Sequence, residues 1–333
     1  MNASRIVFTG IRKVELQDQE RPAAGLDEVV VRTERTLISP GTELAMYEGT
    51  HSALQDPEVP FAKYPHGPGY AAIGRVEDCG ASVDNLKAGD RIFFTGPHAT
   101  WSLLKPASGL WLPLPDEIQP NNALFARLVQ IAATASHCLR RRPERVIVLG
   151  AGLIGLFAAQ VLQAEGVPEV VLQDINAARL AIAKRCGVRR CVLGAGLSLE
   201  ASLGQMSSRP NAVIEATGVP NLVPAALAAV MPGGDVVLLG SPRGFVELDI
   251  YKYIHRKGVA LIGAHEIALP DRAPAPQPSR QALLEQAMRW LGDGKICVDG
   301  LVTDVVRPVE MAVTYERMSV DKSNVLGVVV DWS

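Results

Sequence analysis

Three glycines near the middle of the chain have the spacing of a loop that binds a dinucleotide. Gly150, Gly152 and Gly155 fit the pattern G-x-G-x-x-G. In such a loop the first glycine permits a tight turn, the second lets a pyrophosphate approach the backbone, and the third lets a helix pack closely on the strand before it. A carboxylate follows at Asp174, where sites of this kind bind the adenosine ribose hydroxyls. Its charge repels a 2′-phosphate, so the pattern predicts NAD rather than NADP as the cofactor.

The elements around these glycines are those that such a site requires. The apolar run 146–149 indicates a buried parallel strand, and residues 153–165 continue with the apolar spacing of a helix. The N-terminus of that helix would direct its free N–H groups at the pyrophosphate. A second strand, 169–173, ends at the carboxylate. This order distinguishes the loop from a glycine-rich turn in another βαβ unit, in which Asp174 would only cap a helix.

Further apolar runs predict an α/β fold with a doubly wound, six-stranded parallel sheet of the Rossmann type. After the first two strands, the next ones are expected at Arg190–Leu193, Ala212–Glu215, Val236–Leu239 and Val259–Ile262. Ligands of such sheets bind outside the carboxyl ends of the strands. The turns after two of these strands are therefore expected near the cofactor, unless they are ordinary strand-end turns. The residues predicted to bind the cofactor are Gly150, Gly152, Leu153, Ile154, Gly155, Asp174, Ile175, Ala216, Thr217, Gly240 and Ser241.

Residues 1 to about 125 have the pattern of a β-rich domain. Short strands are expected at Arg5–Phe8, Lys13–Leu16, Val29–Thr33, Tyr70–Cys79 and Asp90–Phe94, separated by Gly, Pro and Asp turns. A partly open β-barrel is the natural package for such strands. Helices are predicted over 123–139 and 280–291. The apolar tail 324–332 is expected to return to the first domain as a strand, because the six-stranded sheet is already complete.

The composition excludes several classes of protein. Charged residues make up 20% and hydrophobic residues 48% of the chain, which argues against disorder. A net charge of −2 gives no electrostatic reason to expect nucleic acid or an anionic membrane as a partner. The five cysteines form no C-x-x-C pair, which argues against a disulfide framework and fits a reducing cytoplasm. No apolar signal region or run of roughly 18–20 apolar residues is present, so we expect a soluble, cytoplasmic protein.

The order of the two domains resembles that of the medium-chain dehydrogenase/reductase superfamily. The matching segments are Gly89–Arg91, Val146–Gly155, Asp174–Asn176, Gly233–Gly240 and Leu301–Thr303. The resemblance implies a GroES-like catalytic domain over residues 1–125, an NAD-binding Rossmann domain over 126–263 and a return to the catalytic domain over 264–333. It also implies a homodimer that pairs along the strand 259–262.

The metal ligands of the zinc enzymes in that superfamily are replaced in this sequence. Pro40 stands where the first zinc cysteine would be, Ala45 where a proton-relay histidine would be, and Tyr70 where a zinc histidine would be. The third ligand aligns with Gln130 if His137 is the histidine of the corresponding helix. Zinc binds thiolate, imidazole or carboxylate, so the resemblance implies that no metal is held here. The cysteine-rich lobe of the structural zinc is absent as well.

Two segments resemble a zinc-free branch of the superfamily. Residues 39–43 and 68–70 look like the group that contains the bacteriochlorophyllide hydroxyethyl dehydrogenases and sorbitol- and threonine-dehydrogenase-like proteins. Gly327 departs from the pattern, because relatives often have Lys or Arg there in contact with the cofactor phosphates.

Without a metal, removal of the hydroxyl proton needs a general base and donors that stabilise the developing charge. The candidates are Thr42, Glu43, Tyr70, Gln130 and His66. Thr42 could pass a proton onward, and Glu43 could be the base or a structural carboxylate bonded to backbone N–H groups. Tyr70 could bond the reacting oxygen or simply pack. Gln130 could orient a hydroxyl or bond within the core, and His66 could contact substrate or lie exposed in a loop. Of the other histidines, His51 and His98 rank lower, and His255 and His265 receive no role.

The sequence therefore predicts an NAD-dependent, zinc-independent dehydrogenase of a secondary alcohol, most plausibly a sugar or cyclitol derivative, or a reductase of the matching ketone. Three alternatives remain open. A hydroxyethyl-tetrapyrrole dehydrogenase would need a broad apolar cleft. A zinc-free quinone or enone reductase usually prefers NADPH, which Asp174 disfavours. A non-catalytic NAD-binding sensor would bind the cofactor without turning it over.

Overall fold

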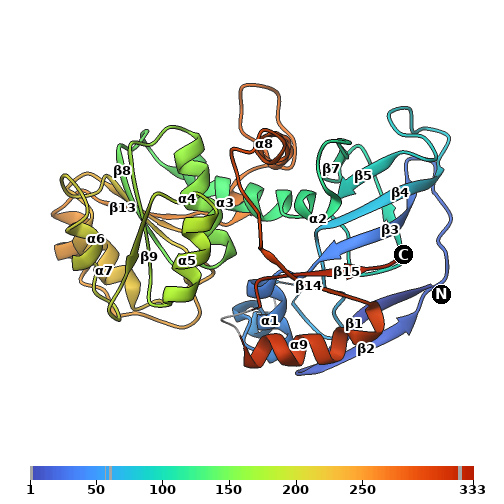
Figure 1. Cartoon of the computed structure of the whole chain (residues 1–333), viewed down its shortest axis with the longest axis horizontal. Coiled ribbons are helices and arrows are strands. Elements are labelled where there is room, and N and C mark those ends of the chain that lie inside the picture. The colour runs from blue at the N-terminus through green and yellow to red at the C-terminus, as the bar shows by residue number, and fades with distance from the viewer. Residues whose placement is uncertain (1–2, 57, 60–61, 322–324) are drawn as a thin grey trace. The chain divides into compact units, whose positions relative to one another are not determined.

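The computed structural model describes residues 3–56, 58–59, 62–321 and 325–333, and the chain divides into two compact units. Unit 1 comprises Met1–Arg127 and Gly300–Ser333, and unit 2 comprises Leu128–Asp299 (Figure 1). The chain thus returns to unit 1 at Gly300, later than the predicted residue 264. Residues 264–299, which include a long helix, belong to unit 2 instead.

Unit 2, all of whose residues are described, contains a six-stranded parallel sheet. Its strands are β8 (Arg145–Leu149), β9 (Glu169–Asp174), β10 (Arg190–Leu193), β11 (Ala212–Glu215), β12 (Asp235–Leu238) and β13 (Ala260–Gly263). They lie in the order β10-β9-β8-β11-β12-β13, and every neighbouring pair is parallel. Numbered along the chain this is the order 3-2-1-4-5-6 of a Rossmann sheet, so the predicted fold class is confirmed.

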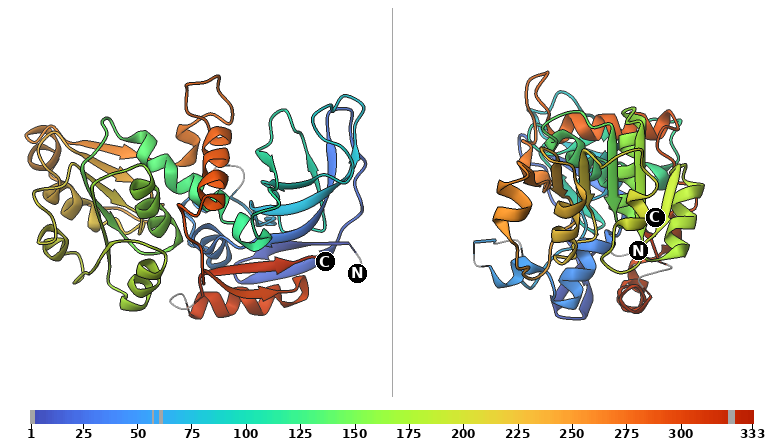
Figure 2. Two further views of the ribbon diagram at one scale, coloured as in Figure 1. Left: turned by 45° about the horizontal axis from the view of Figure 1, so that its top comes forward. Right: turned by 90° about the vertical axis from the view of Figure 1, so that its left-hand side faces the viewer.

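Helices lie on both faces of this sheet (Figure 2). They are α4 (Leu153–Ala164), α5 (Ala177–Arg185), α6 (Glu200–Leu203) and α7 (Leu222–Ala229). Two further helices are α3 (Ala126–Cys138), before β8, and α8 (Arg280–Gly292), later in the chain. The central strands are mainly apolar because both faces are covered, and Val146, Ile147 and Val148 are fully buried. The side chain of Asn176 accepts hydrogen bonds from two backbone N–H groups at the start of α5, as a helix cap does.

Unit 1 is built on a seven-stranded sheet and a separate hairpin. The hairpin pairs β1 (Ser4–Gly10) with β2 (Lys13–Asp18). The sheet contains β3 (Val29–Leu37), β4 (Ala72–Cys79), β5 (Arg91–Phe94), β6 (Trp101–Leu104), β7 (Trp111–Pro113), β14 (Val302–Val306) and β15 (Gly327–Asp331). Its helices are α1 (Pro40–Glu48), α2 (Pro120–Ala123) and α9 (Met311–Val320). The predicted return of the tail is confirmed, because β15 pairs with β3, while Asn324, its predicted first residue, lies outside the described residues.

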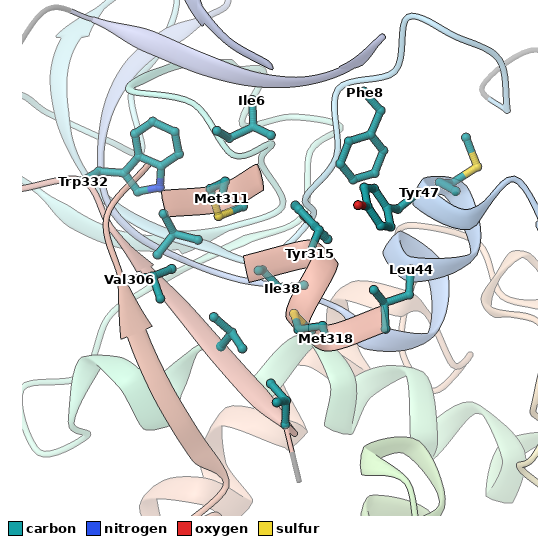
Figure 3. Close-up of a cluster of buried hydrophobic side chains, with 14 of the residues drawn as sticks. Ile6, Phe8, Ile38, Leu44, Tyr47, Val306, Met311, Tyr315, Met318 and Trp332 are labelled. Carbon is teal, nitrogen blue, oxygen red and sulfur yellow. The ribbon is translucent and has the colours of Figure 1, made fainter. Parts of the chain in front are cut away.

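The core of unit 1 joins segments from both ends of the chain (Figure 3). Phe8 of the hairpin, Tyr47 of α1 and Tyr315 of α9 form an aromatic group at its centre. The rings of Phe8 and Tyr315 meet edge to face at 4.9 Å, and those of Tyr47 and Tyr315 stack at 5.6 Å. Such pairs contribute beyond the area that they bury. Helix α1 is thereby held against α9, and this contact fixes the helix that follows β3.

In the part of the chain that the structure describes, the helices are all too short or too polar to cross a membrane.

Candidate active site

The glycine loop of unit 2 has the geometry that its sequence predicts. Gly150 has a φ of +97°, which other residues adopt only under strain. A Cβ at Gly155 would lie 1.8 Å from the carbonyl oxygen of Gly150, so only glycine lets α4 start this close to β8. A Cβ at Gly152 would meet nothing within 4 Å, which leaves that side of the loop open to a ligand. The three glycines therefore permit the turn, leave the backbone open on one side and allow the close helix packing.

Asp174 is fixed beside this loop at the end of β9. One carboxylate oxygen accepts a hydrogen bond of 2.6 Å from the N–H of Ala151, and the other accepts one of 2.7 Å from the N–H of Asn176. Each carboxylate oxygen has about two acceptor sites, so both oxygens keep capacity for the hydroxyls of a ribose. The next side chain, Ile175, is 70% exposed.

A buried carboxylate that the sequence analysis missed organises the turn after β11. Glu215 is fully buried and accepts hydrogen bonds from the N–H of Thr217 at 2.7 Å and of Gly218 at 3.0 Å, as well as from the Thr217 hydroxyl. Burial raises the pKa of Glu215, while these donors lower it. The carboxylate thus holds the turn from within the sheet, and its signal in the sequence is an acid at the end of an otherwise apolar strand.

The turns after β8, β11 and β12 lie in contact at this edge of the sheet. A Cβ at Gly150 would lie 2.7 Å from Cγ2 of Thr217, and one at Gly218 would lie 2.5 Å from the carbonyl oxygen of Ser241. A Cβ at Gly240 would lie 2.5 Å from the nitrogen of Gly218. The predicted cofactor residues are therefore brought together in one unit. With the open side at Gly152 and the carboxylate of Asp174, this set fits a nicotinamide dinucleotide.

In unit 1, Tyr70 lies at the centre of a cluster of polar groups. Its phenol donates a hydrogen bond to the Ser39 hydroxyl and also bonds with the Thr42 hydroxyl. The guanidinium of Arg127 lies over the Tyr70 ring, with its central carbon 5.3 Å from the ring centroid. Burial raises the pKa of Tyr70, and the nearby charge of Glu43 adds to that rise, whereas the two hydroxyls and the guanidinium oppose it. Tyr70 therefore remains a protonated phenol at neutral pH.

Glu43 is held inside unit 1 rather than presented to solvent. Only 2% of it is exposed. One carboxylate oxygen accepts a hydrogen bond of 2.8 Å from the N–H of Ser39, and the other accepts one from the Tyr315 hydroxyl and lies 3.0 Å from Nε2 of His98. Three partners in the core thus engage this carboxylate. The arrangement favours the structural interpretation of Glu43 over a role as general base.

His66 and Gln130 are the other two predicted catalytic residues. His66 is in a loop whose backbone pairs with Phe8 through bonds of 2.8 and 2.9 Å, and its ring packs 6.1 Å from the ring of Phe8. Gln130 is fully buried on α3 in unit 2. Of the predicted residues, Thr42 and Tyr70 are joined by a hydrogen bond, and the charge of Glu43 acts on Tyr70. Ser39, His98, Arg127 and Tyr315 complete the cluster and were not among the predicted site residues.

The side chains at the positions of the zinc ligands do not fit a zinc ion. Pro40 offers no donor, the phenol of Tyr70 is engaged with two hydroxyls, and Gln130 offers only a carboxamide. Among the described residues, no group of three or more His, Cys, Asp or Glu side chains is arranged to hold a metal ion.

Two family models match the chain. The alcohol dehydrogenase GroES-like domain matches residues 25–103, and the zinc-binding dehydrogenase model matches residues 154–276. The L-threonine 3-dehydrogenase of Shewanella sp. strain ANA-3 is 27% identical over 281 residues, which cover 75% of this chain and 80% of the relative. The sheet domain of unit 1 and the parallel sheet of unit 2 correspond to these two models.

Solved structures share the fold over nearly the whole chain. Galactitol-1-phosphate dehydrogenase from Escherichia coli aligns with a TM-score of 0.81 at 20% identity, covering 98% of this chain and 99% of the other. An Escherichia coli CFT073 protein described as a short chain alcohol dehydrogenase, complexed with NADH, aligns with a TM-score of 0.80 at 18% identity, covering 99% of each chain. At these identities the alignments show a common fold.

We predict that Gly155→Ala lowers the melting temperature of unit 2, because the added methyl group would lie 1.8 Å from the carbonyl oxygen of Gly150. An alanine inside a helix otherwise stabilises it by about 0.5–1 kcal/mol relative to glycine, so a decrease would show that the clash dominates. Thermal unfolding followed by circular dichroism measures the effect. Gly152→Ala is the matched control: its melting temperature should not change, whereas its affinity for NADH should fall. An unchanged melting temperature for Gly155→Ala would contradict the close packing.

Proposed function

We propose that this chain, which belongs to the medium-chain dehydrogenase/reductase superfamily, is an NAD-dependent, zinc-independent dehydrogenase that interconverts a secondary alcohol and its ketone. The observation that carries the proposal is the Tyr70 cluster. A phenol with two hydroxyl partners and a guanidinium over its ring occupies the position at which zinc relatives place a metal ligand. These groups supply what alcohol chemistry needs without a metal: a proton donor and acceptor, and positive charge near the reacting oxygen.

The cofactor would be held by unit 2. The open backbone at Gly152 and the N-terminus of α4 would take the pyrophosphate, and Asp174 would take the adenosine ribose. Bound there, NAD supplies a hydride acceptor, and NADH supplies a hydride donor. The carboxylate of Asp174 favours NAD over NADP because it repels a 2′-phosphate.

The proton would be moved by unit 1. Reduction of a ketone needs a proton at the carbonyl oxygen, and the phenol of Tyr70 carries one at neutral pH because burial raises its pKa above the usual value of 10.0. Oxidation of the alcohol needs the phenolate, which the guanidinium of Arg127 and the hydroxyls of Ser39 and Thr42 would stabilise. Ketone reduction should therefore fall, and alcohol oxidation should rise, as the pH passes above 10.

The substrate class follows from the relatives and remains part of the proposal. L-threonine and galactitol 1-phosphate, the compounds for which two relatives are named, both carry secondary hydroxyl groups. We propose a hydroxylated small molecule of this kind, a sugar or cyclitol derivative. The five cysteines are free thiols, which supports a reducing compartment such as the cytoplasm.

Tyr70→Phe is expected to lower kcat for ketone reduction by about 10²- to 10⁴-fold, the usual contribution of a general acid, while the affinity for NADH stays unchanged. Oxidation of NADH measured by its absorbance, over a panel of hydroxyketones, gives both values. Tyr64→Phe removes a half-buried phenol of the same unit that bonds with a backbone carbonyl, and it should retain activity. Dialysis against a metal chelator should leave the wild-type rate intact. A chelator-sensitive rate would contradict zinc independence, and full activity of Tyr70→Phe would contradict the role of the phenol.

Asp174→Asn should shift the cofactor preference toward NADPH by at least about tenfold in kcat/KM. The amide keeps an oxygen that can accept from the N–H of Ala151 but lacks the charge, and two like charges about 4 Å apart repel by roughly 1 kcal/mol in water and about 4 kcal/mol near a protein surface. Asp293→Asn, at an exposed carboxylate of the same unit, should leave the preference as it is. An unchanged ratio in Asp174→Asn would mean that another residue distinguishes the two cofactors.

We also propose a homodimer that pairs along β13. This strand is one end of the sheet of unit 2 and has no charged residue, whereas β10 at the other end begins with Arg190. Light scattering should give the mass of two chains, and Leu261→Lys on β13 should give one chain. Leu193→Lys on β10, at a leucine that is 58% exposed, should keep the dimer. A wild-type chain that is monomeric at micromolar concentration would refute the pairing.

A further inference from the structure

We infer that His98 is a positioning residue for Tyr70: its imidazole and its backbone join the turn before Tyr70 to the first turn of α1. This inference rests on the proposed role of Tyr70. Ser39, which accepts the hydrogen bond of the Tyr70 phenol, belongs to one of these segments, and Tyr70 itself ends the other. The two residues are 31 positions apart in the sequence, so a third group must set their distance.

The side chain of His98 holds the segment that contains Ser39. The residue is fully buried. Its Nε2 lies 3.0 Å from the carboxylate of Glu43, whose other oxygen accepts the backbone N–H of Ser39 at 2.8 Å. Its Nδ1 lies 2.6 Å from the hydroxyl of Thr36, near the end of β3. The imidazole therefore reaches the residues on both sides of the Ser39 turn.

The backbone of His98 holds the segment that precedes Tyr70. Its N–H donates to the carbonyl of Pro68 at 2.8 Å, and its carbonyl accepts from the N–H of Ile6 at the same distance. Gly69 lies so close that a Cβ there would be 2.6 Å from the nitrogen of His98 and 3.0 Å from its ring. With a φ of +102°, Gly69 also sets the direction in which the chain enters Tyr70.

The hydrogen bonds around His98 form a chain with one consistent direction. The indole N–H of Trp332 donates to the Thr36 hydroxyl at 3.0 Å. If Thr36 then donates to Nδ1, the proton of the neutral imidazole is on Nε2 and points to Glu43. In this arrangement every donor of the chain has an acceptor, and the carboxylate receives three donors.

The imidazole at this position bears on the rate because the placement of Tyr70 depends on it. A catalytic group that is misplaced by about 1 Å can lose about 10²-fold in rate. A side chain without a hydrogen-bond donor here would leave the carboxylate of Glu43 with one bond fewer. The Ser39 turn, whose N–H binds the same carboxylate, would then be held less firmly. Loss of the Nε2 bond should therefore act on the rate through Tyr70, and not on the binding of the cofactor, which is held by unit 2.

Two amide variants separate the two ring nitrogens. The amide nitrogen of His98→Gln can take the place of Nε2 and donate to Glu43, whereas the shorter amide of His98→Asn can only take the place of Nδ1. We expect His98→Asn to lower kcat for ketone reduction about 10- to 100-fold with little change in KM for NADH, and His98→Gln to recover most of that loss. His255→Asn, at an exposed histidine of unit 2, is the control and should match the wild type.

A double-mutant cycle with Tyr70→Phe distinguishes positioning from general support of the fold. If His98 acts through Tyr70, His98→Asn should have almost no further effect in the Tyr70→Phe background. If the same fold-loss appears in both backgrounds, or if His98→Asn and His98→Gln lose equally, the inference is wrong. If Tyr70→Phe alone retains full activity, the proposed function fails instead.

A second variant applies if His98→Asn does not fold. Thr36→Val frees Nδ1 while keeping the imidazole, and it should show a loss of about tenfold that again vanishes in the Tyr70→Phe background. A wild-type rate for that variant would overturn the inference.

Discussion

The structure of unit 1 depends on the burial of one carboxylate, that of Glu43. An ionised group in a protein core costs several kcal/mol unless it is paired and hydrogen-bonded. Glu43 meets this cost with three donors, from the Ser39 backbone, the ring of His98 and the hydroxyl of Tyr315. Each donor comes from a different part of the chain, and Tyr315 lies 272 positions away. The carboxylate can therefore be satisfied only when α1, the loop of His98 and α9 are all in place.

The same charge influences the proposed catalytic group. Glu43 raises the pKa of Tyr70, and Arg127 over the ring lowers it, so the phenol experiences opposing charges. The hydroxyls of Ser39 and Thr42 add to the lowering, yet burial outweighs both of them. A metal would stabilise the alkoxide through its own charge. Here the substrate oxygen would instead exchange a proton with the phenol of Tyr70, whose pKa is set by its neighbours.

Local pattern predicted unit 2 well because its signals lie close together in the sequence. The glycines, the apolar runs and Asp174 fall within one βαβ unit, and each has a backbone or packing reason to be what it is. Unit 1 was harder to predict, since its contacts join distant segments. Helix α1 was not predicted because Ser39-Pro-Gly-Thr42 has the composition of a turn, although proline suits the first position of a helix. His98 had no local pattern at all, as its partner Glu43 is 55 positions away.

The divided sequence of unit 1 has a consequence for how the protein folds during synthesis. Unit 2 is one continuous stretch, Leu128–Asp299, and can fold on the ribosome as soon as it has emerged. Unit 1 is translated first but must wait for the segment 300–333, which brings β15 to β3, Tyr315 to Glu43 and Trp332 to Thr36. Until then the carboxylate of Glu43 lacks one of its three donors, and β3 is paired with β4 and β6 but not with β15. Most of unit 1 is thus synthesised before unit 2 but completes its folding after it. An incomplete chain would expose the interior of unit 1 to chaperones and proteases.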